Sequence, residues 1–93
     1  MSLEITVQFT IINKLGLHAR AAAKLASTAG KYGCTIKTGP TPHKMVDAKS
    51  VMSLMLLAAS QGTVLHFYFE GNDAERAHRD IELLLANRFD EEQ

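Results

Sequence analysis

The residues of this 93-residue chain best suited to chemistry lie in one stretch, Gly16-Leu17-His18-Ala19-Arg20. Gly16 allows a turn after a predicted strand, and an alanine-rich helix begins directly after the histidine. We therefore expect the His18 ring at the positive end of a helix, where the N–H groups of Ala19 and Arg20 are free to bind an anion. A nucleophilic ring nitrogen facing an anion site has the arrangement needed to accept a phosphoryl group.

His18 and Arg20 have separate predicted roles in this stretch. A neutral imidazole is a nucleophile at neutral pH, and the guanidinium of Arg20 offers phosphate oxygens a planar fork of donors. Position alone leaves a plainer interpretation open, because a histidine before a helix is often an exposed side chain or a weak cap.

The other histidines and the single cysteine show no pattern of ligand spacing. His43 lies in a proline-rich turn, His66 in a predicted strand and His78 in a predicted helix. Cys34 has no histidine near it in sequence, and we expect it to be a small buried apolar residue. The sequence therefore predicts no metal site and no cofactor.

The elements that must position His18 follow from the hydrophobic periodicity. Period-two alternation predicts a strand over 3–11, and apolar residues at helical spacing predict a helix over 18–29. The further predicted elements are strands over 34–38 and 44–47, a helix over 50–59, a strand over 63–70, and a last helix capped by Asn72. This β-α-β-β-α-β-α order predicts an α+β fold, an open-faced β-sandwich whose four-stranded antiparallel sheet carries three helices on one face.

Length and composition predict a single domain over residues 1–93, with a frayed acidic tail at about 90–93. The chain shows no apolar run long enough to span a membrane and no export signal, so we expect a cytoplasmic protein. Residues 1–60 carry seven Lys or Arg against two Asp or Glu, a net +5, whereas residues 61–93 carry three against eight, a net −5. The basic residues are scattered among few aromatics, so nucleic acid is not an expected partner.

The predicted helix over 50–59 has too many apolar residues for one buried stripe. We expect Val51, Met52 and Met55 to face partly outward, where methionines adapt to partner surfaces. Deeper burial of this helix is the alternative. Ser50 is a natural N-cap, and a phosphate added there would disturb partner binding more than folding.

Two separated motifs resemble the HPr family, the histidine phosphocarriers of the bacterial phosphotransferase system. Gly16-Leu17-His18-Ala19-Arg20 is similar to the active-site motif of the family, and residues 46–55 are similar to the motif around its regulatory serine. Gln61-Gly62-Thr63 also fits, and the resemblance covers nearly the whole chain. The stretch 13–18 and the acidic end further resemble the nitrogen-branch paralogue, NPr.

The resemblance implies a role for each matching residue. His18 would receive a phosphoryl group on Nδ1 from enzyme I, itself charged by phosphoenolpyruvate, and pass it to an enzyme IIA-type protein. Arg20 would steady the group, and Ser50 would match the serine that a kinase modifies in some lineages. The partner-facing residues would be Lys24, Val51, Met52 and Met55. Ala21 departs from many members, which have proline there, and predicts a slightly looser start of the helix.

Function thus has one leading interpretation and two alternatives. The leading one is a monomeric carrier in sugar uptake or nitrogen regulation, rather than a stand-alone enzyme. A regulatory docking module switched by phosphorylation at Ser50 or His18 is the second. The third is a ferredoxin-like domain that binds a small molecule, because that fold shares the β-α-β-β-α-β order.

Overall fold

The computed structural model describes residues 3–93, and it contains the predicted antiparallel sheet. Its strands are β1 (Leu3–Thr10), β2 (Thr35–Thr41), β3 (Lys44–Asp47) and β4 (Val64–Gly71). They lie in the order β1-β4-β2-β3, and every neighbouring pair is antiparallel. A ferredoxin-like sheet is also antiparallel but has its first and third strands in the centre, whereas β4 and β2 are central here, so that alternative was wrong.

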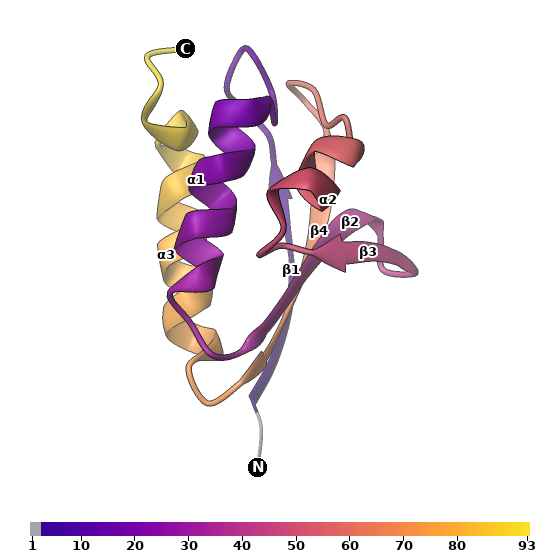
Figure 1. Ribbon diagram of the computed structural model, residues 1–93, viewed down its shortest axis with the longest axis vertical. Helices are drawn as coiled ribbons and strands as arrows, with labels where there is room; N and C mark the ends of the chain where they lie inside the picture. Colours follow the sequence, from indigo (N-terminus) through magenta and orange to yellow (C-terminus); the bar gives the residue numbers. More distant parts are fainter. Residues whose placement is uncertain (1–2) are drawn as a thin grey trace.

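The helices all cover one face of this sheet, as Figure 1 shows. They are α1 (Ala19–Gly30), α2 (Val51–Leu56) and α3 (Ala74–Ala86), followed by a short 3-10 helix, η1 (Arg88–Asp90). Each long helix buries one apolar stripe, centred on Leu25 in α1 and on Ile81 in α3. Because α1 and α3 run in opposite directions, the end of the chain returns to the start of α1 (Figure 1). The predicted open-faced sandwich is confirmed.

The core lies between the helices and the inner face of the sheet. Leu65, Phe67 and Phe69 alternate along β4 and are at most 1% exposed, whereas His66 and Tyr68 between them point to the open face. Phe67 contacts Phe9 with ring centroids 5.4 Å apart. The β4 strand therefore packs against α3 and contributes its aromatic side chains to the core that the sheet shares with the helices.

Three predicted boundaries were wrong, each for a local reason. The α2 helix ends at Leu56 rather than at residue 59, because Ala58 adopts a left-handed φ of 50° and turns the chain. The β2 strand continues through Pro40 to Thr41, since the register shifts there and proline is tolerated at a bulge. The N-cap of α3 is Asp73, not Asn72.

The Asp73 carboxylate makes no capping hydrogen bond in the described part of α3, and instead joins the loop before α3 to the loop before β2. It accepts hydrogen bonds from the backbone N–H of Gly33 at 2.8 Å and of Cys34 at 3.0 Å. The hydrogen bond from Gly33 lowers the pKa of the Asp73 carboxyl. Cys34 is buried, as predicted, and this burial raises the pKa of its thiol to about 11.

The acidic tail differs most from expectation, because it folds back instead of fraying. Phe89 in η1 is 1% exposed and joins the core, which anchors the segment after α3. The backbone N–H of Lys14 donates to the carbonyl of Gln93, so contacts continue to the last residue. No helix in residues 3–93 has the length and apolar character to cross a membrane.

Candidate functional site

The loop between β1 and α1 is held in place by hydrogen bonds over residues 13–17, directly before His18. Asn13 is fully buried, and its side-chain amide donates to the carbonyl of Gly16 at 2.8 Å. Gly16 has a φ of +69°, a left-handed conformation that suits glycine. The N–H of Leu17 then donates to the carbonyl of Ala59 at 2.8 Å, and the Leu17 side chain is buried. These contacts fix the point at which α1 begins.

His18 is the N-cap of α1, as the sequence predicts. Its φ of −76° and ψ of 179° are extended, and among the described residues its side chain makes no capping hydrogen bond. The ring is therefore not used to satisfy the N–H groups of the first turn, which begins at Ala19 and Arg20. The side chain is 26% exposed, so one edge of the ring is open to a reacting group.

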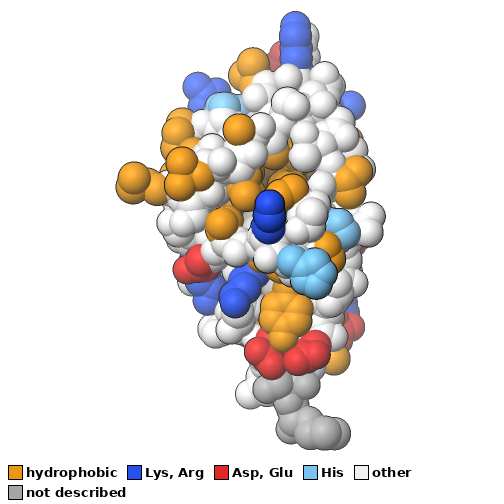
Figure 2. Space-filling model, turned by 90° about the vertical axis from the view of Figure 1, so that its right-hand side faces the viewer, with side chains coloured by type: hydrophobic (Ala, Val, Ile, Leu, Met, Phe, Trp, Pro, Cys, Tyr) orange, Lys and Arg blue, Asp and Glu red, His pale blue; other side chains and the backbone are white. Residues whose placement is uncertain are grey.

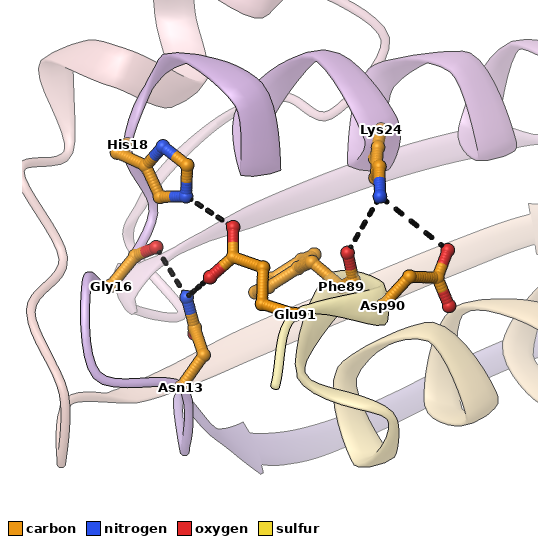
Figure 3. Close-up of polar contacts among 7 residues, drawn as sticks. All are labelled: Asn13, Gly16, His18, Lys24, Phe89, Asp90 and Glu91. Atoms are coloured by element: carbon orange, nitrogen blue, oxygen red, sulfur yellow. Dashed lines mark hydrogen bonds and ion pairs between the residues drawn. The ribbon is translucent and has the colours of Figure 1, made fainter. Parts of the chain in front are cut away.

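Glu91 contacts this ring and was not predicted from the sequence. One carboxylate oxygen of Glu91 is hydrogen bonded to Nε2 of His18, and the other accepts from the amide of Asn13 at 3.0 Å. Figure 3 shows Nδ1 of His18 on the far side of the ring from Glu91. Partial burial favours the neutral carboxyl, but the hydrogen bonds from His18 and Asn13 outweigh it and lower the pKa of Glu91.

Cationic side chains lie around the same end of α1. Lys14, Arg20 and Lys24 line an open hollow of about 490 Å³ together with the tail residues 90–93. The ammonium of Lys24 donates to the carbonyl of Phe89 at 2.9 Å and lies 3.6 Å from a carboxylate oxygen of Asp90 (Figure 3). Lys24 is thus engaged by the tail rather than projecting freely, whereas Arg20 is exposed.

The apolar surface predicted on α2 is present. Val51, Met52 and Met55 are 36%, 79% and 45% exposed. Leu56, for which the sequence predicted no orientation, is 84% exposed. Figure 2, viewed from the side on which α2 lies in Figure 1, shows hydrophobic side chains protruding from this face. We call Val51, Met52, Met55 and Leu56 the α2 patch.

Ser50 caps α2, as predicted. Its hydroxyl accepts a hydrogen bond from the backbone N–H of Ser53 at 3.2 Å. Ser50 is partly exposed and directly precedes the α2 patch. The cap is therefore confirmed, and its modification stays a prediction.

The other titratable candidates lie apart from His18. The His78 ring stacks on Phe9 at 5.7 Å between centroids, which indicates a packing role. His43 is exposed beyond β2 and His66 lies in β4. Among residues 3–93, no three His, Cys, Asp or Glu side chains gather to hold a metal ion.

Comparison with known proteins decides the family. Residues 5–87 match the family model described as the PTS HPr component phosphorylation site. The phosphocarrier protein HPr of Pseudomonas aeruginosa is 51% identical over 85 residues, which is 91% of this chain and 94% of that protein. The chain belongs to the HPr family. It is a phosphocarrier of the phosphotransferase system, as the resemblance implied, and its place in the nitrogen branch stays a prediction.

Solved HPr structures share the fold. HPr-C-His from Thermoanaerobacter tengcongensis has a TM-score of 0.88 and 40% identity, covering 96% of this chain and 99% of that one. An HPr dimer from the same organism has a TM-score of 0.73 and 41% identity, covering 91% and 97%. The HPr family match ends at residue 87, so η1 and Glu91 lie outside it.

Proposed function

We propose that His18 is the phosphoryl acceptor of this carrier, receiving the group on Nδ1 from enzyme I and passing it to an enzyme IIA-type protein. One observation carries the proposal: His18 lies at the N-terminus of α1 with Nδ1 turned away from Glu91. The lone pair of Nδ1 attacks phosphorus while the bond to the donor breaks, and the electron pair of that bond stays with the donor. The reverse step delivers the group to the acceptor protein.

The first turn of α1 supplies the stabilisation that this transfer needs. The phosphoryl group on His18 carries two negative charges. Its oxygens are stabilised by the backbone N–H groups of Ala19 and Arg20 and by the positive end of the helix dipole. The exposed guanidinium of Arg20 adds charge-assisted hydrogen bonds. This stabilisation is moderate, which suits a carrier because a group bound too tightly would not leave for the next protein.

The α2 patch is the surface that we propose for docking on both partners, and we propose Lys24 on α1, beside the tail, as a further partner-facing residue. A carrier that docks on two proteins in turn needs an accessible, adaptable surface, and exposed methionines provide one. The same patch would serve enzyme I and the acceptor at different times. We therefore propose that the chain acts as a monomer, and that a phosphate on Ser50 beside the patch would weaken docking.

Replacing Met52 by serine is expected to raise the KM of enzyme I for this chain roughly fivefold to tenfold, because a contact that buries a large apolar side chain is lost. The matched control is Leu83→Ser, which removes a side chain that is 63% exposed on α3. Steady-state transfer assays should show an unchanged KM for the control. Equal effects of the two substitutions would contradict docking through the α2 patch.

Transfer of labelled phosphate from phosphoenolpyruvate tests the proposed function. The chain, enzyme I and Mg²⁺ are expected to give a labelled protein whose bond is lost in acid and kept in base, as a phosphorylated imidazole nitrogen requires. A label that survives acid would point to a hydroxyl ester such as one on Ser50. That result, or no label with either a sugar-type or a nitrogen-type enzyme I, would favour the docking module instead.

A further inference from the structure

The segment after the family match, residues 88–93, folds back and contacts His18 through Glu91. Arg88, Phe89 and Asp90 have φ values of 56°, 55° and 65°, so three consecutive non-glycine residues adopt the left-handed conformation. Burial of the Phe89 ring and the hydrogen bond from Lys24 to the Phe89 carbonyl hold this turn. The turn directs the next residue, Glu91, onto the start of α1 (Figure 3).

Both carboxylate oxygens of Glu91 are used at this position. One oxygen is hydrogen bonded to Nε2 of His18. The other accepts a hydrogen bond from the side-chain NH₂ group of Asn13, which is a donor only. The Glu91 side chain is 13% exposed, so water competes little for these oxygens. A carboxylate that accepts from Nε2–H leaves the lone pair of the neutral ring on Nδ1.

We propose that Glu91 is a positioning residue for phosphoryl transfer, which fixes the Nε2–H tautomer and the orientation of the His18 ring. This inference rests on the proposed function of His18. When the lone pair of Nδ1 forms the bond to phosphorus, the ring keeps its proton on Nε2 and becomes cationic. The carboxylate of Glu91 then faces that positive charge, while the phosphoryl group lies on the opposite side, towards the first turn of α1.

The Glu91→Gln variant separates this role from simple packing. A glutamine has the same shape, but it presents one oxygen and one NH₂ group to two partners. If its oxygen faces Nε2–H, its NH₂ group opposes the amide of Asn13. If it turns over, its NH₂ group faces Nε2 and favours the other tautomer of His18. Glu92→Gln is the matched control, because it makes the same charge change at an exposed neighbour.

Two readouts are measured on the full chain. Nitrogen-15 NMR of the unphosphorylated protein is expected to show the Nε2–H tautomer of His18 in the wild type and in Glu92→Gln, and a population of the Nδ1–H tautomer in Glu91→Gln. The rate of phosphorylation by enzyme I and phosphoenolpyruvate is expected to fall at least tenfold in Glu91→Gln and to stay within twofold in Glu92→Gln. An unchanged tautomer or an unchanged rate in Glu91→Gln overturns the proposal.

Failure of the proposed function would look different. A wild-type protein that shows the Nε2–H tautomer but accepts no phosphate would overturn the acceptor role of His18, and the role of Glu91 in transfer with it. If the wild type is labelled and the Glu91→Gln variant has the same tautomer or the same phosphorylation rate, only the role of Glu91 is overturned.

Discussion

A His18→Ala variant is expected to lose phosphoryl labelling completely. The substitution removes the ring whose Nδ1 is turned away from Glu91, and neither Ala19 nor Arg20 supplies a nucleophile in its place. An uncharged methyl group leaves the loop from Asn13 to Leu17 in place, because its hydrogen bonds do not use the histidine side chain. Incubation with labelled phosphoenolpyruvate and enzyme I measures the loss.

The remaining histidines provide the controls for this experiment. His43→Ala and His66→Ala change imidazoles that lie away from α1, so both variants should be labelled as fully as the wild type. Urea unfolding of His18→Ala should give nearly the wild-type midpoint, which separates loss of chemistry from loss of fold. Labelling that persists in a folded His18→Ala protein would show that the acceptor lies elsewhere.

A Gly16→Ala variant is expected to lower the free energy of unfolding by roughly 2–4 kcal/mol, the combined cost of a left-handed alanine and a backbone clash. Gly16 has a φ of +69°, and a Cβ atom there would lie 2.5 Å from the carbonyl oxygen of Ala59. That oxygen is the acceptor for the N–H of Leu17, so relief of the clash would shift the residue before His18. Phosphorylation should therefore slow as stability falls.

Gly30→Ala is the matched control, made at the last residue of α1. A Cβ atom at Gly30 meets no described heavy atom within 4 Å, and its φ is not positive. Alanine there should stabilise the protein by about 0.4–1 kcal/mol through a smaller entropy of the unfolded chain. Equilibrium urea unfolding of both variants gives the comparison. A neutral Gly16→Ala variant would contradict the account of a rigid loop that presents His18.

The periodicity of the sequence was sufficient to predict β1, β4 and both long helices, because each turns one regular apolar face towards the core, whereas β3 was predicted from the turn residues before it. Leu65, Phe67 and Phe69 show this in β4, where alternation alone distinguishes the buried face from His66. The errors fell where the backbone leaves regular structure. The left-handed Ala58 ended α2 early. Asp73 rather than Asn72 became the N-cap residue of α3, and its carboxylate bonds to Gly33 and Cys34, which precede it by about 40 residues.

The site was predictable only as far as it is local. His18 and Arg20 lie at the start of α1 because a glycine turn and an alanine-rich helix are adjacent in sequence. Glu91 lies 73 residues from His18, and no periodic pattern reports a contact over that separation. Phe89 was the signal available in the tail, since an aromatic residue among acidic ones indicates an anchor rather than a frayed end.

The nitrogen that carries the phosphoryl group tests the central claim most directly. Phosphorus-31 and nitrogen-15 NMR should be recorded on the chain after phosphorylation by enzyme I and phosphoenolpyruvate. We predict a phosphorus–nitrogen coupling to Nδ1 of His18, with Nε2 still protonated and facing Glu91. Coupling to Nε2 of His18, to another histidine, or to no nitrogen at all would contradict the account.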